Sequence, residues 1–83
     1  MSNSKEVLEL QYPFVFKGNT VSSLEVRRPT VADQLTADKL SGSDAETEIQ
    51  LFANLCEVEP SLFDGMDLKD YRGIQEIYSS FLS

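Results

Sequence analysis

The fold is decided by the stretch VLELQYPFVFKGNTVSSLEVRR, residues 7–28. Its first part carries apolar side chains at every even position from Leu8 to Phe16, and this period of two is typical of a half-buried strand. The turn signal Lys17-Gly18-Asn19-Thr20 follows, because glycine and asparagine tolerate positive φ angles. A second strand then covers residues 20–27, so residues 7–28 are predicted to form a β-hairpin.

The first strand carries two further expectations. Pro13 cannot donate a backbone hydrogen bond, so this strand should lie at a sheet edge or bend at that point. An isolated hairpin is only marginally stable in water, so the hairpin must pack on the residues that follow it. The aromatic run Phe14-Val15-Phe16 leaves open whether this part of the strand packs inward or contacts a partner.

Residues 30–83 are predicted to be helical, beginning with a short helix. Thr30 is a good N-cap, and Asp33 three residues later completes a variant of the capping box. This helix should end near Leu40. Three of its apolar side chains are expected to face inward: Val31, Ala32 and Leu35.

A second helix over residues 44–57 is expected to be the central helix of the domain. Ser43 is its N-cap, and Glu46 occupies the matching position of a capping box. Its apolar side chains span about 200° of the circumference: Ala45, Ile49, Leu51, Phe52, Ala53, Leu55 and Cys56. We interpret Cys56, which lies within this arc, as a small buried hydrophobic residue.

A short helical turn after Pro60 precedes the last helix, which is capped by Asp67. The apolar arc of this helix covers about half of its circumference and contains Leu68, Tyr71, Ile74, Ile77, Tyr78, Phe81 and Leu82. In one interpretation the arc packs on Phe52 and its neighbours. In the other, part of the arc is exposed as a docking surface.

The order of elements predicts an α+β fold, with an N-terminal β-hairpin followed by three main α-helices. The 83 residues allow a single small domain over residues 1–83, in which we expect residues 1–6 to be disordered. A domain of this size buries only about 60–65% of its unfolded surface. Formation of a homo-oligomer or binding of a partner would therefore add to its stability.

The composition excludes several classes of function. The chain has no histidine and one cysteine, so it lacks the commonest acid–base group and cannot form a disulfide or a thiolate zinc site within itself. It has no signal peptide and no apolar run of membrane length, so we expect a cytoplasmic protein with no membrane attachment. Phosphate-binding and calcium-loop spacings are also missing, and we expect no catalytic, metal or cofactor site and no enzyme activity.

The net charge of −7 is unevenly distributed. Residues 1–31 carry a net +1 and residues 32–83 a net −8. This balance argues against nucleic-acid binding, which requires lysine and arginine to neutralise phosphates. The acids form either a solvated surface or one that selects a basic partner. The pair Arg27-Arg28 either solubilises the end of the hairpin or pairs with those acids.

Several landmarks occur in an order that resembles the tail assembly chaperones of contractile-tailed bacteriophages, the Mu-like and P2-like kind. The segments that carry the resemblance are Gly18-Asn19, residues 24–30, Asp33-Gln34-Leu35, residues 44–60, residues 62–71, Ile74-Gln75 and Phe81-Leu82. Within residues 62–71, the best local match is Asp67-Leu68-Lys69-Asp70-Tyr71. The conjunction of these motifs, in one order over residues 8–82, makes the match.

The resemblance implies a binding protein of the bacterial host cytoplasm. Its partner would be the tape-measure protein, a very long, aggregation-prone helical chain that such chaperones hold soluble while the tail tube assembles around it. It also implies that this chain is the short form of a pair, whose longer, frameshifted form recruits tail-tube protein. Capture of an apolar helix face in a groove fits this role, and a net charge of −7 would keep the complex soluble.

We expect partner binding on the last helix, because its apolar arc is wide. The residues are Tyr71, Ile74, Tyr78 and Phe81, and the alternative is that they belong to the core. Two other classes of function stay open. The acids of residues 32–83 would suit an acidic protein-binding inhibitor or nucleic-acid mimic, and the broad apolar faces would suit a self-assembling structural subunit.

Overall fold

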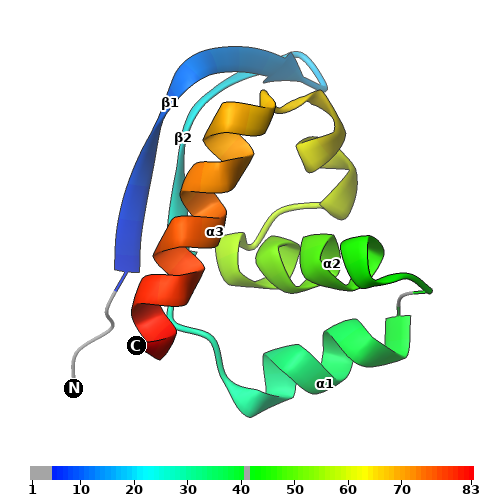
Figure 1. The fold of residues 1–83 in the computed structure, drawn as a ribbon. Helices are drawn as coiled ribbons and strands as arrows, with labels where there is room; N and C mark the ends of the chain where they lie inside the picture. Colours follow the sequence, from blue (N-terminus) through cyan, green and yellow to red (C-terminus); the bar gives the residue numbers. More distant parts are fainter. Residues whose placement is uncertain (1–4, 41) are drawn as a thin grey trace.

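The computed structural model describes residues 5–40 and 42–83 and confirms the predicted α+β order in one small domain. The elements are β1 (Lys5–Phe16), β2 (Asn19–Arg27), α1 (Val31–Leu40), α2 (Asp44–Cys56), the 3₁₀ helix η1 (Pro60–Gly65) and α3 (Leu68–Leu82). The hairpin curves along one side of the molecule with α3 running beside it, and α1 and α2 lie one below the other on the opposite side (Figure 1).

The hairpin begins earlier than the sequence predicts. β1 starts at Lys5, which lies opposite Arg27 and brings its ammonium nitrogen to 3.7 Å from a carboxylate oxygen of Glu25. Lys5 and Glu6 therefore belong to the strand, because β2 is long enough to pair with them. The rest of the segment predicted to be disordered, residues 1–4, lies outside the described residues.

The turn of the hairpin has two residues instead of four. Lys17 and Gly18 both have positive φ angles, 51° and 82°, as a type I′ turn requires. Asn19 and Thr20, which the sequence assigns to the turn, belong to β2 and pair with β1. The sharp turn follows from the twist of the two strands, which a type I′ turn matches.

A bulge in β1 lies at the proline. Between the paired residues Glu9 and Phe14, β1 has four residues and β2 only Ser22, so the strand register shifts there. Asp70, from α3, covers part of this gap. Its carboxylate accepts hydrogen bonds from the backbone N–H groups of Gln11 and Tyr12, at 2.9 and 3.0 Å. The prediction that the strand bends near Pro13 is confirmed, and the bend is held by a side chain almost sixty residues away.

The core lies between the hairpin, α2 and α3. Its largest fully buried side chains are Val26, Phe52, Leu55 and Ile74. The central position predicted for α2 is confirmed, although Ala45 is exposed because the first turn of this helix extends past the hairpin and α3 (Figure 1). Cys56 was predicted to be buried and is half-buried against the core, and this burial raises the pKa of its thiol to about 12.

The inward face of α1 differs from the prediction. Val31 and Leu35 are exposed, at 77% and 56%, and Ala32 is exposed as well. The described α1 side chains that are buried belong to Asp33 and Ala37. The physical reason is the carboxylate of Asp33, whose hydrogen bonds from the chain before α1 turn that side of the helix toward the protein.

Two glycines allow β1 to pack closely on the rest of the chain. A Cβ atom at Gly73 of α3 would lie 3.0 Å from Cδ1 of Leu8, and one at Gly65 would lie 3.3 Å from the ring of Phe14. Phe14 and Phe16 are half-buried against the core, whereas Val15 between them is 68% exposed. The aromatic run therefore packs inward through its two phenylalanines.

Candidate partner-binding surface

The structure places two of the four predicted partner-binding residues in the core. Ile74 is fully buried and Phe81 is 8% exposed, so neither presents a surface to a docked helix. At these two positions the burial fits the alternative that the sequence left open, membership of the core. The reason is the hairpin, which covers part of the apolar arc of α3 (Figure 1). The sequence pattern did not show which part of the chain would cover that arc.

The remaining two predicted residues are the half-buried Tyr71 and Tyr78. The Tyr71 ring packs against Phe63, at a centroid distance of 6.0 Å, and its hydroxyl donates a hydrogen bond to Glu48 at 2.7 Å. Burial and this hydrogen bond raise the pKa of Tyr71 well above its usual value. Tyr71 therefore links α3 to α2. Tyr78 packs on Phe52 with one side of its ring and lines a groove with the other.

That groove runs between α1 and the pair α2–α3, and its first half is apolar. This half has a volume of about 240 Å³, and seven residues line it: Pro29, Thr30, Val31, Gln34, Leu51, Tyr78 and Leu82. Val31 on α1 and Leu82 on α3 are large apolar side chains that stay 77% and 63% exposed. Exposed apolar side chains that line one hollow are typical of interaction surfaces.

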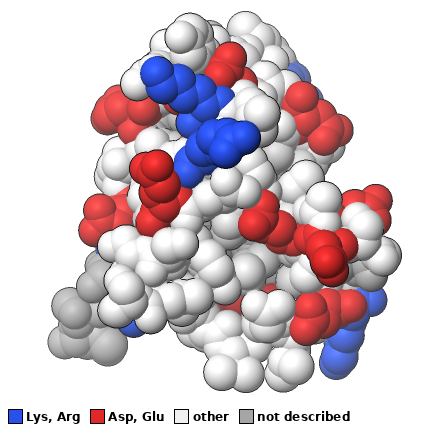
Figure 2. Space-filling model, viewed as in Figure 1, with Lys and Arg blue, Asp and Glu red and all other residues white. Residues whose placement is uncertain are grey.

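The second half of the groove is acidic. It has a volume of about 320 Å³ and is lined by Gln34, Asp38, Asp44, Thr47, Glu48, Leu51, Phe52 and Tyr78. Because Gln34, Leu51 and Tyr78 line both, the two hollows are adjacent, and together we call them the α1 groove. Figure 2 shows acidic side chains gathered on the right of this view, over the facing ends of α1 and α2.

The α1 wall of the groove is fixed to the end of β2 by an ion pair. The guanidinium of Arg27 donates two hydrogen bonds to Asp33, both of 2.8 Å, and Thr30 donates two more from its N–H and hydroxyl, both of 2.9 Å. The N–H of Asp33 donates to the Thr30 hydroxyl in return, which confirms the predicted capping box. The hydrogen bonds from Arg27, against the opposing effect of burial, lower the pKa of Asp33 to about 2.

The neighbouring arginine fixes the α3 side of the same region. A guanidinium N–H of Arg28 donates to the backbone carbonyl of Phe81 at 3.1 Å, and the guanidinium carbon lies 5.5 Å from the centre of the Phe81 ring. A cation at the C-terminal end of a helix is favourable. Arg27 and Arg28 thus hold α1 and α3 in place. Of the two roles left open for this pair, solubilising the end of the hairpin or pairing with acids, Arg27 has the second.

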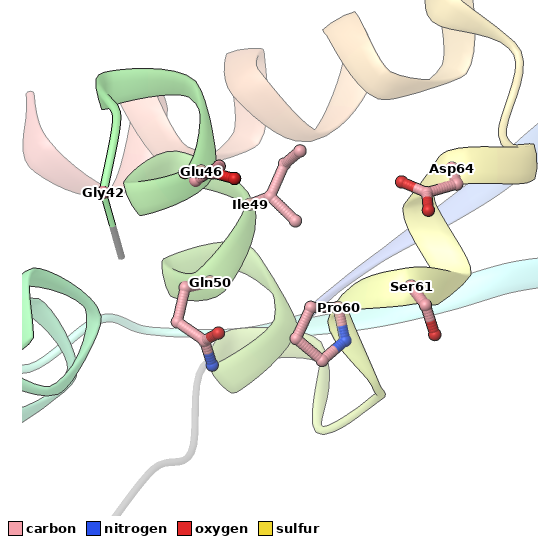
Figure 3. A pocket seen from close by; sticks show the side chains of 7 residues that line it. All are labelled: Gly42, Glu46, Ile49, Gln50, Pro60, Ser61 and Asp64. Atoms are coloured by element: carbon pink, nitrogen blue, oxygen red, sulfur yellow. The ribbon is translucent and has the colours of Figure 1, made fainter. Parts of the chain in front are cut away.

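A separate hollow lies between the start of α2 and η1 (Figure 3). It has a volume of about 310 Å³ and is lined by Gly42, Glu46, Ile49, Gln50, Pro60, Ser61 and Asp64. Glu46 is engaged in the capping box of α2, where it accepts the N–H of Ser43 at 3.2 Å. Among the described residues, no three histidine, cysteine or acidic side chains are placed to hold a metal ion.

Residues 7–83 match the family described as "Phage tail assembly chaperone proteins, E, or 41 or 14". The match covers nearly the whole sequence, and the chain belongs to this family. Its role is therefore that of a chaperone in phage tail assembly, with protein partners in that process. No curated protein and no solved structure matches the chain. Within the described residues, no helix is long and apolar enough to cross a membrane.

The sequence pattern did not indicate the α1 groove. Only Tyr78 of the four predicted residues lines it. Val31 was expected to face inward, and Leu82 was part of the α3 arc, for which core packing and exposure as a docking surface were both left open. A usable signal was the spacing of Asp33 and Ala37, which lie one helical turn apart. Together with the arginines just before α1, this spacing could have predicted that Asp33 and Ala37 face the protein and that Val31 is exposed.

Proposed function

We propose that this chain binds the tape-measure protein of its phage and keeps it soluble during tail-tube assembly. We further propose that the phage is contractile-tailed and of the Mu-like or P2-like kind. The chain would act in the host cytoplasm and would have no enzyme activity. A longer form sharing these residues would add recruitment of tail-tube protein. Membership of the tail assembly chaperone family supports the class of function, and the surface supports the client.

The observation that carries the proposal is an apolar groove on a strongly acidic protein. Val31, Leu82 and the ring of Tyr78 offer a helical client an apolar hollow to dock in. The net charge of −7 would keep the coated client apart from other copies and in solution. Many weak contacts along one long client would add up through avidity, so each groove needs only modest affinity.

Co-expression tests the proposal. The chain would be produced with the tape-measure protein encoded beside it, and affinity-purified in about 0.5 M salt, where the Debye length is roughly 4–5 Å. We expect soluble tape-measure protein to copurify only when the chain is present. Tape-measure protein that stays insoluble, while the chain purifies alone, would refute the proposal.

The alternative class is an acidic inhibitor or nucleic-acid mimic, favoured by the net −8 of residues 32–83. It predicts a partner with a basic site and a complex that dissociates in the same salt, since exposed charge pairs are screened there. Retention of the partner at about 0.5 M salt separates apolar capture from this charge-based alternative.

A further inference from the structure

We propose that the α1 groove binds one helical segment that is apolar along one face and basic at one end. This proposal rests on the proposed function, because it specifies the chemistry of the client segment. The apolar half of the groove indicates an apolar face on the partner, and the acidic half indicates basic residues at one end of it.

The apolar half is open between two walls. Val31 on α1 and Leu82 on α3 stand on opposite sides of it, and Leu51 and Tyr78 also line it. Leu51 is only 5% exposed, so the apolar surface continues from the two exposed side chains into the core. The apolar stripe of an amphipathic helix, with residues spaced three and four apart, has the shape and chemistry to fill this hollow.

The orientation of α1 gives an independent argument. A surface helix normally turns its apolar side chains toward the core. In α1 the inward side chains are Asp33 and Ala37, while Val31 and Leu35, which lie one turn apart on one face, point outward. Packing of the monomer therefore does not account for this exposed apolar pair. A helix docked in the groove accounts for Val31, which lines it, whereas Leu35 lies outside the groove lining.

The acidic half selects the charge of the segment. Two of its acids have structural roles, since Asp44 lies in the favourable first turn of α2 and Glu48 accepts hydrogen bonds from α3. Asp38 lies near the C-terminal end of α1, where a negative charge is unfavourable for the helix. Its neighbour Lys39 does not line the groove. Asp38 accepts one exposed hydrogen bond within α1, from the side chain of Gln34 at 3.2 Å, and we assign to it the attraction of a partner's lysine or arginine.

The length of α1 sets the size of the segment. Its ten residues span about 15 Å, so the groove faces about three turns of a docked helix. A contact of this size is small, and tight retention of a long client then depends on many copies binding along it.

Peptide binding to the full chain tests the proposal. The probe is a synthetic helical peptide of about 14 residues, long enough for roughly four turns, with leucines along one face and lysines in its last turn. A second peptide carries glutamates in place of the lysines. Binding would be measured by calorimetry, with circular dichroism spectra of each protein variant as a check of folding.

The variants probe each half of the groove with a matched control. Val31→Asp and Leu82→Asp alter the apolar half, and Val15→Asp, on the exposed face of β1, introduces the same charge outside the groove. Asp38→Lys alters the acidic half, and Glu9→Lys on β1 makes the same change of charge outside it. All five positions are exposed, so the variants are expected to fold.

We expect the lysine peptide to bind the wild-type chain and to lose about tenfold or more in affinity with Val31→Asp, Leu82→Asp and Asp38→Lys. The two β1 controls should stay within about twofold of the wild type. Asp38→Lys should in turn prefer the glutamate peptide, because the charge pair is then restored in reverse. Binding that is absent in the wild type, or unchanged in all three groove variants, overturns the proposal.

Two further measurements separate this inference from its rivals and from the proposed function. If sedimentation shows a dimer that Val31→Asp dissolves, a second copy occupies the groove, and the proposal of a client helix is wrong. If the wild-type chain and the groove variants solubilise the tape-measure protein equally well, the groove proposal fails while the proposed function stands. If peptide binding follows the prediction but the wild-type chain does not solubilise the client, the groove proposal stands and the proposed function fails.

Discussion

Removal of the Asp70 carboxylate tests how the hairpin is held. In Asp70→Ala the N–H groups of Gln11 and Tyr12 lose their acceptors, at 2.9 and 3.0 Å, inside the bulge. A hydrogen bond to a charged group contributes about 1.5–3 kcal/mol to stability. Asp70 is 3% exposed, but Gln11 and Tyr12 are exposed residues, so water can replace part of the loss. We therefore expect the free energy of unfolding to fall by about 2–3 kcal/mol.

This loss is large for so small a domain, whose total stability should be about 4–12 kcal/mol. Urea unfolding followed by circular dichroism measures it, and amide hydrogen exchange should show lost protection at Gln11 and Tyr12. Asp70→Asn keeps one acceptor oxygen and should cost about half as much. The control Asp67→Ala removes the N-cap of α3, and should cost about 1 kcal/mol without affecting exchange in the bulge. A cost below about 0.5 kcal/mol for Asp70→Ala, with protection intact, would refute the reasoning.

Four further outcomes follow from contacts described above. Gly73→Ala should destabilise the chain by about 1 kcal/mol in urea unfolding, because the added Cβ would crowd Leu8. In a Leu8→Ala variant the same substitution should stabilise the chain, because the crowding is gone and the gain in helix propensity remains. The pKa of Asp33 is lowered to about 2 in the folded chain. The ionised carboxylate therefore contributes its full stabilisation of the fold above the ordinary pKa of 3.8, and this contribution disappears as the pH falls through about 2. Asp33→Asn should accordingly be about 2 kcal/mol less stable than wild type near neutral pH, with the gap closing in acid unfolding titrations. Glu57→Gly should raise the unfolding free energy by about 0.5–1 kcal/mol, because Glu57 ends α2 with a φ of 59° and glycine adopts this conformation without strain. The ion pair with Arg27 that is lost, at 3.6 Å, is exposed and contributes little. Cys56 should react with a thiol reagent much more slowly than a free cysteine at neutral pH, since burial raises the pKa of its thiol to about 12.

Local signals predicted the elements of the fold and several of their ends. The alternation before Phe16, the glycine in the turn and the capping box of Ser43 all act within a few residues of each other, and sequence patterns report such interactions well. The predicted inward face of α1 was wrong because the apolar residues of this short helix do not gather on one side, so they give a weak pattern. There, the charge pair between Arg27 and Asp33 decided the orientation.

Contacts between distant parts of the chain could not be predicted. Nothing near Asp70 in the sequence points to the bulge that it caps, and nothing near Ile74 or Phe81 shows that a hairpin covers them. An apolar arc on a helix indicates that the arc is covered, but it does not say whether the cover is the same chain or another one. For this reason only Tyr78 of the four predicted positions lies in the α1 groove.

The link between Asp70 and the bulge also has a consequence for the order of folding. The hairpin is made first on the ribosome, but the carboxylate that completes it is made 59 residues later. Until α3 emerges, the nascent hairpin has free N–H groups in its bulge and no helix along its inner face. Contacts between residues so far apart slow folding, because a long loop must close before they form. The chain is therefore expected to fold in one cooperative step after α3 is made, with its apolar strands exposed until then.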